Sequence, residues 1–158
     1  MNKSFPHPTI DSNIGGCAHF LFTLASHVDR IFVDSINAKV SWLVLKAGKE
    51  FSSGYSSYGS LSFEQKTTKN PSGTFYQVKI TGFYPRITPQ VVAIMDSMLS
   101  QGFVVAITDN NKVTRLCGNP ATPLFFSYDQ KTGSSAADRN GLEFSFSGQV
   151  QHPCPELL

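Results

Sequence analysis

The chain has few charged residues and no long apolar run, and both shortages exclude classes of protein. Charged residues make up 15% of its 158 residues, and the net charge at pH 7 is +2. A charge this small gives no electrostatic reason to expect nucleic acid as a principal or sequence-specific ligand. No apolar run approaches the roughly 18 residues of a transmembrane helix, so we expect no membrane partner. The length predicts a single domain, residues 1–158, with enough chain to bury a core.

Cysteine is also scarce. The three cysteines, Cys17, Cys117 and Cys154, are odd in number and far apart, and no Cys-x-x-Cys pair occurs. This spacing predicts no zinc site, and three unpaired thiols are typical of a reducing cytoplasm. No apolar segment follows Lys3, so we expect no signal peptide at this end.

The residues that could carry catalysis are not arranged for it. Cys17 and His19 lie two residues apart on a predicted strand and share its face, which would allow a thiol nucleophile beside a base. A small buried cysteine in a strand is the simpler interpretation. A catalytic or ligand pair of His19 and His27 is possible, but no arrangement of Asp or Cys residues supports it. Neither the glycine spacing of a phosphate loop nor the Asp-x-Asp-x-Asp-Gly pattern of a calcium loop occurs. We therefore predict no catalytic, cofactor-binding or metal-binding residue, no cofactor, no small-molecule substrate and no enzymatic activity.

What the sequence does contain is β-type alternation bounded by turn residues. Phe75 to Phe83 alternates apolar and polar residues, and a second strict alternation follows the Asn140-Gly141 turn. The predicted strands cover residues 17–24, 28–33, 39–46, 61–65, 75–83, 103–108, 113–116, 124–128 and a final run from 142.

Two of these segments carry more detailed expectations. In the strand over 39–46, alternation puts Val40, Trp42 and Val44 on one face and Leu43 and Leu45 on the other, so both faces are expected to be partly covered. By composition alone, residues 67–73 are predicted to be a turn.

One helix is predicted, over about residues 89–101. Thr88 can cap it and Pro89 suits its first position, while apolar residues recur at helical spacing and Gly102 follows as a stop. The predicted fold is therefore mainly β: an antiparallel β-sandwich or barrel of about seven to nine strands with one flanking helix. Residues 1 to about 13 are expected to form an arm. The tail from about 149 contains Pro153 and Pro155 and is expected not to continue a sheet interior.

Two segments are candidates for contacts between subunits. Ser52 to Ser60 is rich in Gly and Ser, and we expect it to be mobile alone and to order its Tyr55 and Tyr58 against a neighbour. Asp138-Arg139-Asn140-Gly141 is simply interpreted as a turn into the last strand, and alternatively presents Arg139 for an inter-subunit salt bridge. The candidate interface residues are Tyr55, Tyr58, Asp138 and Arg139.

The order of several passages resembles small structural proteins encoded by tailed bacteriophages and prophages, notably those of the Bacteroides group. The resemblance is best over roughly the last 60 residues. It lies in an early Gly-Gly, a mid-chain hairpin, the run Phe103 to Asp109, Arg115-Leu116-Cys117-Gly118 with Pro123-Leu124, and the closing segment Asp138 to Gly148.

The tail-tube family is similar in outline, with a β-sandwich of about this size, a flanking helix and a long loop or hairpin used in ring assembly. The resemblance implies a virion structural protein that is assembled in the host cytoplasm and contacts copies of itself and other virion proteins. Three alternatives remain open: another neck, tail-terminator or capsid-associated virion protein; a non-catalytic sandwich that binds a glycan or protein through Tyr55 and Tyr58; and a small enzyme with a hidden site.

Overall fold

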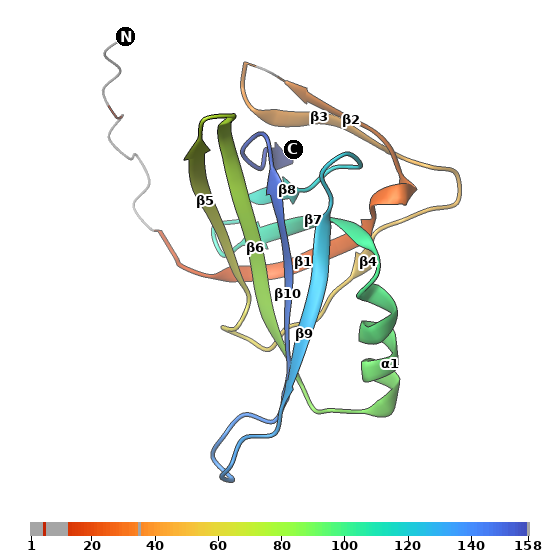
Figure 1. Cartoon of the computed structure of the whole chain (residues 1–158), viewed down its shortest axis with the longest axis vertical. Helices are drawn as coiled ribbons and strands as arrows, with labels where there is room; N and C mark the ends of the chain where they lie inside the picture. The colour runs from red at the N-terminus through yellow and green to blue at the C-terminus, as the bar shows by residue number, and fades with distance from the viewer. Residues whose placement is uncertain (1–4, 6–12, 35, 158) are drawn as a thin grey trace.

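The computed structural model describes residues 5, 13–34 and 36–157, and Figure 1 shows the whole chain. Most of the expected N-terminal arm, residues 1 to about 13, lies outside the described residues. The described residues form one α-helix, α1 (Pro89–Met98), a short 3-10 helix, η1 (Ala25–His27), and an 11-stranded sheet. The strands are β1 (Cys17–Leu24), β2 (Val28–Asp34), β3 (Lys39–Leu45), β4 (Ser52–Ser53), β5 (Ser62–Asn70), β6 (Gly73–Pro85), β7 (Gly102–Asp109), β8 (Thr114–Cys117), β9 (Leu124–Lys131), β10 (Gly141–Val150) and β11 (Glu156–Leu157).

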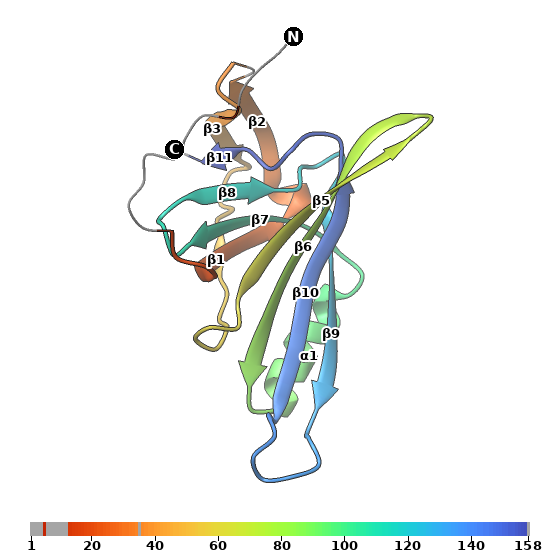
Figure 2. The same ribbon diagram turned by 90° about the vertical axis from the view of Figure 1, so that its left-hand side faces the viewer.

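The strands form a sandwich-like β fold, which confirms the predicted fold class. Long strands β5, β6, β10 and β9 run side by side, and β1, β7 and β8 cross them as a second layer (Figures 1 and 2). The layers join where Gly102 and Phe103 of β7 pair with β9, while the rest of β7 lies between β1 and β8. A Cβ at Gly102 would lie 2.8 Å from Pro123, so the close approach at this corner requires glycine.

The main core lies between the two layers and is rich in phenylalanine. Phe20 of β1, Phe103 of β7 and Phe126, Phe144 and Phe146 of β9 and β10 are each at most 5% exposed. The rings of Phe126 and Phe146 lie 5.1 Å apart between centroids, within the range of favourable aromatic pairs. Phenylalanines of four strands therefore converge on one aromatic core.

Strand β7 is buried on both faces. A second apolar cluster joins Val104 and Ala106 of β7 to Val28 of β2, Val40 of β3 and Leu116 of β8. This explains why the run from Phe103 to Ile107 is apolar throughout instead of alternating.

The predicted faces of β3 are wrong because the strand contains a bulge. Val33 pairs with Val40 and Phe32 pairs with Trp42, so Ser41 is an extra residue between them. The bulge inverts the alternation: Val40 is 2% exposed, whereas Trp42 is 66% exposed. Leu43 and Leu45 pack with Val40 against the second apolar cluster.

The C-terminal tail also differs from the expectation. Strand β10 runs to Val150, and β11 enters the sheet between β3, to which it is parallel, and β8, to which it is antiparallel. The sheet is therefore mixed. Pro155, which precedes β11, has no backbone N–H to donate to the neighbouring strand. Its carbonyl still accepts a hydrogen bond from Leu116 N at 2.9 Å, so the pairing loses only one donor.

The predicted turn over 67–73 is much shorter in the structure. Strand β5 continues to Asn70, which pairs with Gly73, and the β-branched Thr67 and Thr68 pair with Tyr76 and Phe75. Cross-strand packing thus outweighs the turn-like composition. The two strands beyond the predicted nine, β4 and β11, have two residues each, too few for a pattern.

The helix begins as predicted and ends three residues earlier. Thr88 Oγ1 accepts a hydrogen bond from Val91 N at 3.3 Å, and Pro89 is the first helical residue. Met95 is 7% exposed against the main core, whereas Ile94 is 54% exposed. The helix lies beside β9, where Tyr128 donates a hydrogen bond to Asp96 (Figure 1).

Candidate subunit-interface surfaces

The segment Ser52 to Ser60, which we expect to be mobile in an isolated subunit, is hydrogen-bonded to both layers. Ser52 and Ser53 pair with β1, and Gly54 N donates to Phe20 O at 3.1 Å. Ser57 N donates to Phe83 O at 2.8 Å, and Phe83 N donates to Ser56 Oγ at 3.0 Å. Hydrogen bonds of serine hydroxyls and backbone amides therefore hold this segment, which has too few apolar side chains to be held by burial.

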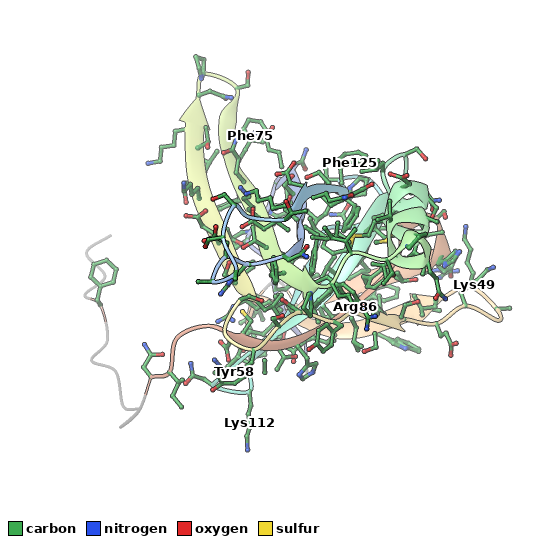
Figure 3. All side chains as sticks on the ribbon, turned by 90° about the horizontal axis from the view of Figure 1, so that it is seen from below. Lys49, Tyr58, Phe75, Arg86, Lys112 and Phe125 are labelled. Carbon is green, nitrogen blue, oxygen red and sulfur yellow. The ribbon has the colours of Figure 1, made fainter. Side chains whose placement is uncertain are left out.

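The two tyrosines of this segment have different environments. Tyr55 is 59% exposed and contacts Tyr84 edge to face, with 5.7 Å between ring centroids. Tyr58 is fully exposed and lies at the periphery of the molecule (Figure 3). An exposed tyrosine on an anchored segment is a suitable contact residue, because little entropy is lost when its ring is buried.

Asp138 and Arg139 also have separate roles. The carboxylate of Asp138 accepts hydrogen bonds from Ser134 N at 2.9 Å and Ser135 N at 2.8 Å, and these bonds lower the pKa of Asp138. Asp138 thus stabilises the β9–β10 loop. The guanidinium of Arg139 lies over the ring of Phe83, 5.2 Å from its centroid. The structure thereby brings Arg139 to the same end of β6 as Tyr55.

A polar groove of about 580 Å³ extends from this end over the outer face of β5, β6, β10 and β9. Its floor carries hydroxyl groups that pair across strands, including Ser127 and Ser145 at 2.9 Å. Charges of both signs line it: Lys79, Arg139, Asp129 and Glu143. Such a surface suits a polar segment of another molecule better than an apolar ligand.

The β2–β3 hairpin carries an exposed apolar patch that the sequence did not predict. Phe32 is 46% exposed and Trp42 66% exposed, with ring centroids 6.1 Å apart, and Val33 and Ile36 of the same hairpin are 49% and 89% exposed. Exposed apolar groups gathered on one element mark contact surfaces. The bulge at Ser41 creates this patch, and no sequence signal marks it.

Within the described part of the chain, the main path of strands ends in β2 and β5, and the two-residue β4 forms a third edge because it pairs with β1 alone. β2 pairs with β3, and β5 pairs with β6. Cys17 N donates to Leu61 O just before β5, and beyond that contact the outer edges of β2 and β5 have no strand partner, which makes them templates for strand addition.

Cys17 and His19 do not share a face, contrary to the sequence-based expectation. The register between β1 and β7 shifts between these residues, so Ala18 is an extra residue. Cys17 packs against the main core, and burial, followed by the charge of Asp109, raises the pKa of its thiol. His19 is exposed, and His27 lies 3.4 Å from the hydroxyl of Thr23 in the η1 region.

The described residues contain no group of three or more His, Cys, Asp or Glu side chains placed to hold a metal ion. No helix among them combines the length and apolar character needed to cross a membrane.

Comparisons with protein-family models, curated proteins and solved structures find no match.

Proposed function

We propose that the chain is a virion structural protein, a tail-tube-like subunit that assembles with copies of itself into a ring. In this proposal the subunit is assembled in the host cytoplasm and also contacts other virion proteins. The observation that carries the proposal is the pair of open sheet edges, β2 and β5, together with the exposed Phe32 and Trp42 on the β2–β3 hairpin.

Addition of β2 of one copy to β5 of the next would continue the sheet from subunit to subunit. The two strands belong to opposite ends of the strand order, so the contact is head to tail and can close into a ring. The net charges favour this pairing: β2 carries Asp29, Arg30 and Asp34, a net charge of −1, and β5 carries Glu64, Lys66 and Lys69, a net charge of +1.

The outline of the molecule supports the same proposal by analogy with the tail-tube family. The fold is a two-layer sandwich with a flanking helix, and the β5–β6 hairpin and the β9–β10 loop project at opposite ends (Figure 2). Projecting elements of this kind can reach neighbouring subunits.

Sedimentation velocity over a range of concentrations tests the proposed contacts. Phe32→Ser and Tyr58→Ser should each weaken self-association by roughly tenfold or more, because each removes an exposed aromatic side chain from a proposed contact. Phe125→Ser is the matched control: Phe125 is 55% exposed and lies on β9, away from Tyr58 in Figure 3. Association that is equally strong in all three variants would contradict the contacts proposed here.

The polar groove with Arg139 over Phe83 supports a second candidate, a non-catalytic binding module. That candidate requires a monomer. A wild-type chain that sediments as a monomer at every concentration would favour it over the ring-forming subunit.

A further inference from the structure

Two of the three cysteines are opposite each other on neighbouring strands. Strand β11 pairs with β8 so that Glu156 faces Arg115 and Leu157 faces Thr114. The hydrogen bond from Leu116 N to Pro155 O, at 2.9 Å, extends this antiparallel register by one residue pair. The next pair in the register is Cys154 with Cys117.

The backbone geometry at this pair suits a disulfide. Because Leu116 and Pro155 are a hydrogen-bonded pair, Cys117 and Cys154 fall at a non-hydrogen-bonded position, where Cα atoms are about 4.5 Å apart. Disulfides span Cα separations of about 4.4 to 6.8 Å. Both side chains contact the main core cluster, so they are directed to the same face of the sheet.

The two thiols differ in access. Cys117 is fully buried, and burial, followed by the adjacent Cys154 thiol, raises the pKa of Cys117 well above its ordinary value. Cys154 is partly exposed, and its backbone N–H donates to Gln65 Oε1 at 2.9 Å. A reagent in solution can therefore reach Cys154 first, while Cys117 lies behind it.

We propose that Cys117 and Cys154 are a redox-sensitive pair that forms an internal disulfide when the chain meets a low-molecular-weight disulfide. The thiolate of Cys154 attacks one sulfur of the reagent, which forms a mixed disulfide and releases one thiol. Cys117 gives up its proton and attacks the sulfur of Cys154, which forms the internal bond and releases the second thiol. Two protein thiols are oxidised and one reagent disulfide is reduced.

The bond would reinforce the junction between β3 and β8. Strand β11 has two residues and is the strand that joins β3, and with it the β2–β3 hairpin, to β8. Beyond its strand pairing, Leu157 packs against the second apolar cluster, Glu156 N donates to Ala38 O at 3.3 Å, and an exposed ion pair joins Lys39 to Glu156 at 3.6 Å. Exposed ion pairs of this kind stabilise little. A covalent bond beside β11 would hold this junction when the surroundings become oxidising.

Incubation of the reduced full-length protein with oxidised glutathione tests the proposal. Peptide mapping without reductant should find a Cys117–Cys154 bond in the wild type and in Cys17→Ser, the control that keeps both partners. The oxidised forms should melt roughly 5–10 °C higher than the reduced forms, and reductant should reverse the shift.

Two further variants keep the test decisive. Cys154→Ser, at a partly exposed position, and Cys117→Ala, which adds no polar group to the core, should show no internal bond and no rise in melting temperature. The proposal is overturned by a bond that involves Cys17, by a glutathione adduct on Cys154 that never closes, or by an internal bond without a change in melting temperature.

Discussion

A single side chain, Asp109, organises the turn between β7 and β8. Its Oδ1 accepts hydrogen bonds from Asn111 N at 2.8 Å and Val113 N at 3.0 Å, and its Oδ2 accepts one from Arg115 Nη1 at 2.9 Å. Partial burial alone would raise the pKa of Asp109, but the bonds from Val113, Arg115 and Asn111 outweigh it and lower the pKa. The same turn lets Lys112 adopt a left-handed conformation, with φ of 66°.

Asp109→Asn should lower the free energy of unfolding at pH 7 by about 1–3 kcal/mol, because it weakens the bond to Arg115 and the amide bonds. Since the folded pKa is lowered, the stabilisation by Asp109 is present above the unfolded pKa of about 3.9 and is lost as the pH falls through the folded pKa. The difference in free energy of unfolding between wild type and variant should therefore narrow as the pH falls below about 3.9. Urea denaturation at a series of pH values from 7 downward measures this difference, with the exposed Asp129→Asn as control. A difference that stays constant over the series would contradict the role given to the carboxylate.

At the scale of single residues, the sequence was least informative about β-bulges. Ala18 and Ser41 are each one extra residue in a strand, and each inverts which neighbouring side chains are exposed. A bulge depends on the partner strand, which local alternation does not report. The separation of Cys17 from His19 and the exposure of Trp42 could therefore not be foreseen.

At the scale of elements, strong local signals gave correct predictions. The cap at Thr88, the apolar run of β7 and the alternation of β10 are all local, and each element begins within one residue of its predicted start. Contacts between distant segments were missed. The position of Arg139 over Phe83 and the entry of β11 between β3 and β8 depend on how the layers meet.

Helix α1 offers a test of which face it buries. Met95→Asp should lower the free energy of unfolding by several kcal/mol, because it would put an unpaired charge into the main core. Ile94→Asp, one residue earlier and 54% exposed, should change it by less than about 1 kcal/mol. Thermal melts compare the two, and a Met95→Asp protein that melts like the parent would mean that this face contacts another molecule.

For the whole molecule, the sequence predicted the class of fold but not its open edges. The mainly β architecture followed from the alternation, whereas the strand order, which leaves β2 and β5 outermost, depends on long-range pairing. The candidate residues Tyr58 and Arg139 were named from composition and turn chemistry. The apolar patch of Phe32 and Trp42 became visible only in the folded chain.

Negative-stain electron microscopy of the purified protein at high concentration tests the central claim most directly. We predict closed rings or short stacks of rings for the wild type, and markedly fewer of them for Phe32→Ser, because the hairpin patch is a proposed contact between copies. Fields of separate single particles at every concentration, with the folded state verified by a cooperative melt, would contradict the ring-forming function.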